Sequence, residues 1–259
     1  MIYRVIMSRL PLSVTIVACN EERNLARALN SVSWAEERLV IDSGSTDRTR
    51  EIAAECGAKV IDQSWLGYGK QKNFAQSHAQ NDWILNLDAD EEISGELAQE
   101  IQALLSGPCK NPENPYHYLI PRKSRYLGRW ILHGGWYPDR KARLGNRHHS
   151  QWTEPAVHEA LVSNRSPGQL KSPILHYPFS GIRDQILTNL RYSRLGYEQR
   201  IQQGQTGGLA LLLLKSISKF LETYILKRGF LDGIPGLIIS VNAAHSVFMK
   251  FSYYFEEKK

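Results

Sequence analysis

The stretch Trp83-Ile84-Leu85-Asn86-Leu87-Asp88-Ala89-Asp90-Glu91-Glu92 decides the expected fold and the expected site. Its apolar part predicts a buried strand, which ends in a cluster of acidic residues. Ligands of open α/β sheets bind at the carboxyl ends of such strands. Residues two apart in a strand point the same way, so Asp88 and Asp90 are expected to face one small volume. Two carboxylates that close repel each other unless a cation lies between them, and hard oxygen ligands suit Mg²⁺ or Mn²⁺. A strand ending in a solvated acidic turn is the simpler alternative.

Three apolar runs upstream of this stretch also predict strands. They cover Leu12–Ala18, Arg38–Ile41 and Ala58–Ile61, and helical patterns separate them. Asn20 is a plausible N-cap for the first helix, which is expected to reach about Val32. The alternation of strands and helices predicts a mostly parallel sheet with helices on both faces. The sequence has no G-x-G-x-x-G and no phosphate-loop motif, which argues against a dinucleotide fold or a P-loop.

Composition narrows the class of protein. The chain has 259 residues and 42% hydrophobic content, enough for one large domain or one domain with a smaller appendage. The three cysteines, Cys19, Cys56 and Cys109, form no C-x-x-C pair, so neither a zinc site nor a disulfide framework is predicted. A reducing compartment is expected, and residues 1–12 hold no apolar core long enough for a signal peptide.

The net charge of +6 hides an asymmetry along the chain. Residues 1–109 hold 10 Lys and Arg against 16 Asp and Glu, whereas residues 110–204 hold 15 against 6. The acidic part contains the proposed metal site. The basic part predicts an anionic partner, either a phosphorylated acceptor or an anionic membrane. Nucleic acid is not expected as a partner, since no zinc-finger, RNP-type or helix-turn-helix pattern is present.

Three motifs resemble the hallmarks of family 2 glycosyltransferases of the GT-A fold. They are Val17-Ala18-Cys19-Asn20-Glu21-Glu22, Val40-Ile41-Asp42-Ser43-Gly44-Ser45-Thr46-Asp47 and Leu87-Asp88-Ala89-Asp90. Gly69-Lys70-Gln71-Lys72-Asn73 and the stretch from Trp136 to Leu144 narrow the resemblance to the branch of lipopolysaccharide inner-core β-1,4-glucosyltransferases. The fold implied is a Rossmann-like, mostly parallel sheet with a small antiparallel extension on the acceptor side, followed by C-terminal amphipathic helices.

The resemblance implies a role for each motif. A divalent cation, Mg²⁺ or Mn²⁺, would be held by Asp90, and Asp88 would touch the ribose or the metal. Lys72 would lie near the diphosphate of a UDP-sugar, where a cation offsets developing charge. The remaining positions would hold the nucleoside: Ala18, Asn20, Glu21 and Asp42. A solvated helix lysine is the alternative for Lys72.

Residues 109–180 are expected to form the acceptor side. Short aromatic-rich strands are predicted over Tyr116–Pro121, Tyr126–Leu132, Trp136–Leu144 and Val157–Val162. Basic residues here would surround a phosphate-bearing acceptor, or form an ordinary basic surface: Arg122, Lys123, Arg125, Arg129, Arg140, Lys141 and Arg143.

An inverting transferase needs a catalytic base beside the acceptor hydroxyl. Two carboxylates of this half are candidates, Asp139 and Glu159. The base of related enzymes lies close to an Arg-Leu pair like Arg143-Leu144, and this resemblance favours Asp139. His158 is expected to be structural, with metal binding as the alternative.

Apolar residues recur at helical spacing beyond residue 181. Helices are expected over 182–203, 209–226 and 233–255, and none holds an uncharged apolar run of the ~18 residues that a membrane span needs. Apolar faces with lysines and aromatics suit helices that lie in a bilayer interface. The resemblance to lipopolysaccharide core enzymes implies that this interface is the cytoplasmic face of the inner membrane. A helical cap on the domain or a dimer contact is the alternative.

The resemblance, together with the acidic pair at Asp88 and Asp90, implies an inverting, metal-dependent transfer of a hexose, glucose from UDP-glucose, to a lipopolysaccharide core sugar. The expected division is 1–108 for the nucleotide sugar, 109–180 for a phosphorylated or lipid-linked glycan acceptor, and 181–259 for the C-terminal helices. Two alternatives remain: the same chemistry on a capsule or polyprenyl-linked acceptor, and a non-catalytic nucleotide-sugar-binding protein of the same fold.

Overall fold

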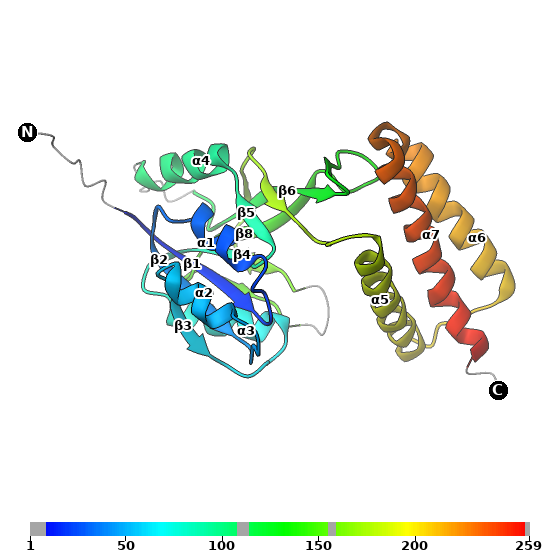
Figure 1. The fold of residues 1–259 in the computed structure, drawn as a ribbon, viewed down its shortest axis with the longest axis horizontal. Helices are drawn as coiled ribbons and strands as arrows, with labels where there is room; N and C mark the ends of the chain where they lie inside the picture. Colours follow the sequence, from blue (N-terminus) through cyan, green and yellow to red (C-terminus); the bar gives the residue numbers. More distant parts are fainter. Residues whose placement is uncertain (1–8, 108–113, 155–158, 257–259) are drawn as a thin grey trace, which may run out of the picture. The chain divides into compact units, whose positions relative to one another are not determined.

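The computed structural model describes residues 9–107, 114–154 and 159–256. Four parallel strands form the first half of its main sheet in the order β3-β2-β1-β4 (Figure 1): β1 (Leu10–Ala18), β2 (Ala35–Asp42), β3 (Lys59–Asp62) and β4 (Trp83–Asp88). Ala18 pairs with Asp42, and Val17 pairs with Asp88. This register brings the carboxyl ends of the three central strands, and the motifs that follow them, to one edge.

Helices cover both faces of this parallel half. Val14 and Ile16 of β1 pack in one cluster with α1 (Leu25–Ser31), α2 (Thr49–Glu55) and α4 (Gly95–Ser106). Val17 points the other way, into a second cluster with α3 (Tyr68–His78). Because side chains alternate along a strand, apolar residues at consecutive positions require apolar cover on both sides. The predicted two-sided α/β sheet is therefore confirmed.

The main sheet continues beyond β4 into an extension that combines two long strands with several short ones. Its order is β4-β8-β6-β12-β5, and β8 (Asp139–Asn146) runs antiparallel to β4. The next strands are β6 (His117–Tyr126), β12 (Ile174–His176) and β5 (Glu91–Ile93), with the two-residue strands β7 (Arg129–Trp130) and β11 (Gly168–Gln169) beside β6. A separate hairpin joins β9 (Ser150–Trp152) to β10 (Leu161–Ser163). This mixed sheet confirms the GT-A architecture that the resemblance predicted.

Three local expectations differ from the structure. Asn20 does not cap the first helix: α1 begins at Leu25 with Asn24 at its N-cap, and Asn20 adopts a positive φ of 57°. Its side chain accepts a hydrogen bond from the backbone N–H of Thr46 at 2.9 Å, so it joins two loops instead. The strand expected over Tyr126–Leu132 is reduced to β7. The strand expected from Val157 is seen only as β10, and Val157 and His158 lie outside the described residues.

The chain divides into two compact units. The first combines residues 1–122 with 140–176 and contains the parallel half of the sheet. The second combines residues 123–139 with 177–259 and contains the C-terminal helices. The compact units thus cut across the three functional stretches expected from the sequence, and the assignment of those stretches to donor and acceptor stays a prediction.

The second unit is built around three long helices, α5 (Ile182–Gln202), α6 (Leu209–Phe220) and α7 (Gly233–Glu256). A π-helical turn, η1 (Leu221–Leu226), and a short 3₁₀ turn, η2 (Gly229–Asp232), connect α6 to α7. Tyr197, Leu212, Phe251 and Tyr254 form one buried cluster between the helices.

One helical stretch of the described chain, Gly229–Glu256, is long and apolar enough to cross a membrane by length and composition. No C-terminal helix was expected to hold an uncharged apolar run of the ~18 residues that a membrane span needs. Only 28% of its most apolar window is buried within the protein.

Candidate functional site

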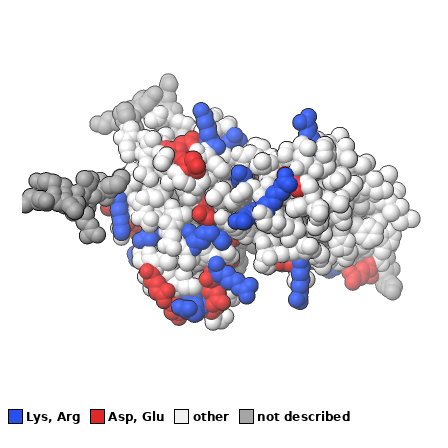
Figure 2. Space-filling view, turned by 45° about the horizontal axis from the view of Figure 1, so that its top comes forward, with Lys and Arg blue, Asp and Glu red and all other residues white. Residues whose placement is uncertain are grey.

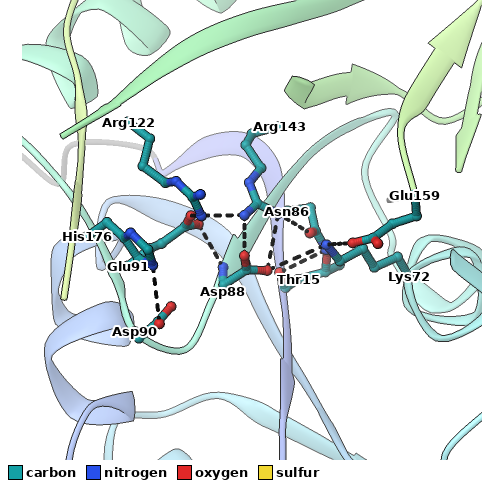
Figure 3. A network of polar contacts seen from close by, with 10 residues as sticks. All are labelled: Thr15, Lys72, Asn86, Asp88, Asp90, Glu91, Arg122, Arg143, Glu159 and His176. Atoms are coloured by element: carbon teal, nitrogen blue, oxygen red, sulfur yellow. Dashed lines mark hydrogen bonds and ion pairs between the residues drawn. The ribbon is translucent and has the colours of Figure 1, made fainter. Parts of the chain in front are cut away.

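Asp88 lies at the carboxyl end of β4, next to the guanidinium group of Arg143 from β8 (Figure 3). Arg143 Nη1 donates to Asp88 Oδ1 at 3.1 Å, and Arg143 Nη2 contacts Asp88 Oδ2. Burial opposes the ionisation of Asp88, but the positive charges of Arg143 and Lys72 outweigh it and hold the pKa of this carboxyl well below its ordinary value. Asp88 is therefore a carboxylate whose charge is largely balanced by protein groups.

Glu91 completes this buried ion-pair network. Its Oε1 accepts from Arg143 Nη2 at 2.9 Å and from Arg122 Nη1 at 3.2 Å, and its Oε2 accepts from the backbone N–H of Asp88 at 3.0 Å. Glu91 and Arg143 are both almost fully buried. Arg122 and Arg143, which the sequence analysis grouped with the acceptor-binding residues, thus hold the acidic loop in place from within the sheet.

Lys72 of α3 points from the other side toward the same carboxylate. Its Nζ lies 2.8 Å from Glu159 Oε1, 3.5 Å from Asp88 Oδ1 and 4.5 Å from the ring centroid of Trp152. The side chain of Lys72 is 8% exposed. The alternative of a solvated helix lysine is therefore wrong, because Lys72 is buried between two carboxylates and an aromatic ring.

Asp90 faces a different partner, His176 of β12. The distance from His176 Nε2 to Asp90 Oδ2 is 3.3 Å, and both side chains are largely buried (Figure 3). Glu21 lies close enough to Asp90 and Asp88 to interact electrostatically with their carboxylates. Burial raises the pKa of Glu21 above its ordinary value, and the negative charges of Asp90 and Asp88 add to that effect. The loop after β1 and the loop after β4 therefore share one electrostatic environment.

The donor set around Asp90 fits a divalent cation. Among the described residues, no group of three or more His, Cys, Asp or Glu side chains is arranged to hold a metal ion by itself. Asp90 supplies a carboxylate oxygen, the type of ligand that suits Mg²⁺ and Mn²⁺, and His176 would add an imidazole nitrogen. Most positions of an octahedral ion are then left to phosphate oxygens and water, as is common for Mg²⁺ beside a nucleotide.

A pocket of about 270 Å³ opens at the carboxyl ends of β2 and β3. Asp42, Arg50 and Trp65 are among its lining residues. Asp42 Oδ2 accepts from Arg50 Nε at 2.7 Å and from the backbone N–H groups of Gly44 and Ser45. Burial opposes the ionisation of Asp42, but hydrogen bonds from Ser45 and Arg50 keep its pKa below the ordinary value. Its Oδ1 is buried without a hydrogen-bond partner among the described residues, an acceptor that a ligand N–H would satisfy.

The Gly69–Asn73 motif anchors α3 beside the site. A Cβ on Gly69 would lie 2.0 Å from the carbonyl oxygen of Thr153, so only glycine allows this approach. Asn73 exchanges two hydrogen bonds with the backbone of Trp152, each 2.9 Å long. Gln71 donates to the hydroxyl of Ser43 at 3.1 Å. These three contacts explain why Lys72 is held in one direction.

The structure brings most of the predicted site residues to one edge of the first unit. Asp88 and Lys72 are in contact, Glu159 joins them through Lys72, and Glu21 is electrostatically coupled to Asp90. Ala18 and Asn20 belong to the same edge through backbone contacts: Ala18 O accepts from the N–H of Ser43. The remaining candidate base, Asp139, begins β8 and groups with the second unit, and His158 lies outside the described residues.

Sequence reasoning missed His176 as a neighbour of Asp90. The residue ends a three-residue strand, Ile174–His176, and no acidic or metal-ligand spacing around it marks it in the sequence. Pairing of β12 with β5 places His176 opposite Glu91, next to Asp90. Only this long-range pairing reveals the contact.

A larger pocket, about 790 Å³, lies away from the carboxylates. Asn73, Gln76, Arg147 and His148 are among its lining residues. The backbone N–H of Arg147 binds the carbonyl of Asp82, which precedes β4, so this pocket lies toward the amino-terminal end of that strand. Parallel sheets bind their ligands at the opposite edge, and the smaller pocket beside Asp42 is there.

The chain matches the model of Glycosyl transferase family 2 over residues 13–158. A glycosyltransferase of Rickettsia typhi, itself uncharacterized, is 33% identical over 251 residues, covering 93% of this chain and 85% of that protein. The lipopolysaccharide core biosynthesis glycosyltransferase LpsC of Rhizobium meliloti is 26% identical over 248 residues, covering 93% of this chain and 90% of that protein.

Among solved structures, the chain is similar to glucosyl-3-phosphoglycerate synthase from Mycobacterium tuberculosis, crystallised with Mn²⁺, UDP and phosphoglyceric acid. The similarity has a TM-score of 0.35 and 26% identity, over 45% of this chain and 43% of that chain. The match to the family model covers most of β1, all of β2, β3 and β4, and the acidic loop after β4. On this match and the full-length relatives, the chain belongs to glycosyltransferase family 2.

Proposed function

We propose that this glycosyltransferase transfers a hexose, glucose from UDP-glucose, with inversion to a sugar of the lipopolysaccharide core. The observation that carries the proposal is the arrangement at one sheet edge: Asp90 beside His176, and Lys72 between Asp88 and Glu159, along the same edge as the Asp42 pocket. The Asp42 pocket would take the base of a UDP-sugar. Asp90, His176 and Lys72 would take its metal-bound diphosphate, with the sugar beside them.

The nucleoside end is supported by Asp42. Its orphaned Oδ1 would accept the ring N–H of uracil, while Arg50 and two backbone N–H groups hold the carboxylate in place. Ala18 ends β1, and Asn20 and Glu21 lie on the loop that follows it; these three residues would line the ribose side.

The diphosphate end is supported by Asp90, His176 and Lys72. Asp90 and His176 would hold a divalent cation, which when bound supplies Lewis-acid stabilisation of the diphosphate leaving group. Lys72 is a buried cation aimed at the same region and would offset developing negative charge. Asp88 is already paired with Arg143 and Lys72, which favours a contact with the ribose over direct metal binding.

Two carboxylates remain candidates for the base that deprotonates the acceptor hydroxyl. Glu159 is supported by its position against Lys72 at the site. Asp139 is supported by the family resemblance of the stretch around Arg143-Leu144. The proposed acceptor is a lipopolysaccharide core sugar on the cytoplasmic face of the inner membrane. The similarity to the Rhizobium meliloti protein supports the choice of a lipopolysaccharide core sugar.

Donor hydrolysis tests the proposal without the acceptor. Purified protein is incubated with a set of nucleotide sugars, with Mg²⁺, Mn²⁺ or chelator, and released UDP is measured. We expect slow metal-dependent release from UDP-glucose, which Asp90→Asn abolishes because an amide has no charge to hold the cation. Asp82→Asn, an exposed carboxylate preceding β4, serves as the matched control. Metal-independent release, or full activity of Asp90→Asn, overturns the metal assignment.

A further inference from the structure

The connection between α6 and α7 exposes large apolar side chains in a dense run. We call residues 226–234 the tip. Leu226 is 77% exposed and Ile234 73%, and Phe230 and Leu231 are each 46% exposed. Single exposed apolar residues are ordinary on protein surfaces, but four within nine positions form a patch that marks an interaction surface.

Two apolar stripes extend from the tip along the helices. On α6 and η1 the exposed side chains are Leu214, Ile217, Leu221 and Ile225, at intervals of three or four residues. On α7 they are Ile234, Leu237, Val241 and Phe248. Residues at such intervals share one helix face, and here this face is directed to solvent, where surface helices usually carry polar residues.

Cationic residues accompany this surface. Lys215 and Lys219 lie on α6, and Lys227 and Arg228 lie in the tip. Between Leu209 and the tip, Glu222 is the sole acidic residue, and it bonds to Lys219 and Lys227. Asp232 is buried and accepts hydrogen bonds from the backbone N–H groups of Leu132 and His133. On the face shown in Figure 2, the helical part of the chain is mostly uncharged, with few acidic and few basic side chains. The surface is therefore apolar with a positive charge.

The buried side of α7 packs against α5 and α6 and includes polar contacts to α5. Asn242 Nδ2 and the hydroxyl of Tyr126 both donate to Gln185 Oε1, and Ser193 bonds to Ser246. The helix α5 carries six charged residues: Arg183, Asp184, Arg191, Arg194, Glu198 and Arg200. If α7 crossed a bilayer with its partners, these charges would enter the hydrocarbon region at high cost. The packing therefore favours helices that lie in the interface.

We propose that the tip and the two stripes dock the protein on an anionic phospholipid bilayer, in the interface plane and without crossing it. The apolar side chains enter the acyl boundary, and Lys227 and Arg228 meet lipid phosphates. A second copy of the chain is a poorer occupant, because a two-fold contact through this surface would place the same cations opposite each other. The inference deepens the proposed function, since it explains how a soluble donor site reaches a lipid-linked acceptor.

Vesicle flotation of the full chain tests the docking surface. Vesicles of phosphatidylcholine alone and with one-quarter phosphatidylglycerol are compared at low and high salt. We expect binding to the anionic vesicles that weakens with salt but persists, since apolar burial is not screened. Leu226→Glu should lower the partition coefficient at least about tenfold, and Arg228→Glu about fivefold or more. Val162→Glu, an exposed apolar site on β10, should bind like wild type.

Four results would overturn the proposal: no flotation with anionic vesicles, wild-type binding by Leu226→Glu, resistance to alkaline extraction, or a dimer in solution that Leu226→Glu dissociates. The third would mean that the helix crosses the bilayer, and the fourth that a second copy covers the surface. Release of UDP from UDP-glucose is measured in every variant. If the wild-type protein releases UDP but does not float, the docking proposal fails and the donor-site assignment stands. If Leu226→Glu loses flotation and still releases UDP, the docking surface is separate from the donor site.

Discussion

Arg143 is the residue on which the geometry of the site depends most. It is buried, and one guanidinium group bridges Asp88, Glu91 and Asn86. Removing one partner of a buried ion pair leaves the other charge unsolvated, which costs more than the pair itself contributes. The acidic loop after β4 is therefore held by a positive charge from a strand that the chain reaches much later.

Arg143→Met should lower the free energy of unfolding by about 3–5 kcal/mol, since Asp88 and Glu91 lose their shared partner. Adding Asp88→Asn to this variant should recover part of the loss, because one uncompensated charge is removed. Urea unfolding of the two single variants and the double variant gives the coupling energy. A coupling near zero would show that the two side chains do not interact in solution.

Glu159→Gln and Asp139→Asn should differ in kind. Loss of the catalytic base lowers the rate of transfer and leaves donor affinity nearly intact, because the base acts on the acceptor. If Glu159 only holds Lys72, Glu159→Gln should instead weaken UDP binding. Steady-state transfer kinetics and UDP titration on both variants distinguish these roles. Comparable transfer by wild type and Asp139→Asn would leave Glu159 as the base.

At the scale of elements, the close approach of α3 to β9 fixes the direction of Lys72. Gly69→Ala should destabilise the protein by more than about 1 kcal/mol, because its Cβ meets a backbone oxygen that cannot move without shifting the hairpin. Gly95→Ala in the first turn of α4 is the control, since no atom lies within 4 Å of its Cβ position. Thermal unfolding of both variants measures the difference. Equal melting temperatures would contradict the packing.

Glu100 of α4 ties that helix to the segment before β12. Its carboxylate accepts from the backbone N–H groups of Lys171 and Ser172, each at 2.9 Å. Burial opposes ionisation, but these hydrogen bonds lower the pKa of Glu100 below its ordinary 4.5. Because the folded-state pKa is depressed, the stabilisation is full above 4.5 and is lost as the pH falls through the folded value.

Glu100→Gln should therefore lower the free energy of unfolding by about 1–2 kcal/mol at pH 7. The deficit should shrink as the pH falls below 4.5, where the wild-type carboxylate also loses its charge. Urea unfolding at several pH values measures it. If the loss of unfolding free energy in Glu100→Gln does not change with pH, the charge of the carboxylate contributes nothing to holding the segment.

At the scale of the whole molecule, charge is divided along the chain. Residues 1–109 carry a net charge of −6 and residues 110–204 a net charge of +9. An anionic acceptor should be attracted by the basic part, and at physiological ionic strength salt largely screens such attraction beyond about 8 Å. Raising the salt from about 0.05 to 0.5 M should lower kcat/KM for a phosphorylated acceptor several-fold. Donor hydrolysis under the same conditions should change little, and an equal loss in both assays would argue against acceptor steering.

The helix and strand pattern of the first unit was accessible from the sequence. Local signals were strong there: apolar runs of β-branched residues, Gly57 at the end of α2, and Ser94, whose side chain caps α4 by accepting from the N–H of Leu97. The antiparallel extension was predicted less well. Several of its strands have only two or three residues, and such strands depend on their neighbours more than on their own sequence.

The sequence by itself determined the order of the parallel strands' motifs, the acidic loop at Asp88 and Asp90, and the family, because these features are encoded by neighbouring residues. Only the tertiary structure decided which charged side chains contact each other. Arg143 reaches Asp88 across 55 positions, and Lys72 reaches Glu159 across 87. His176 reaches Asp90 through the pairing of β12 with β5. Such contacts follow from strand pairing and burial over the whole sheet, and no local pattern specifies which buried charge will find which partner.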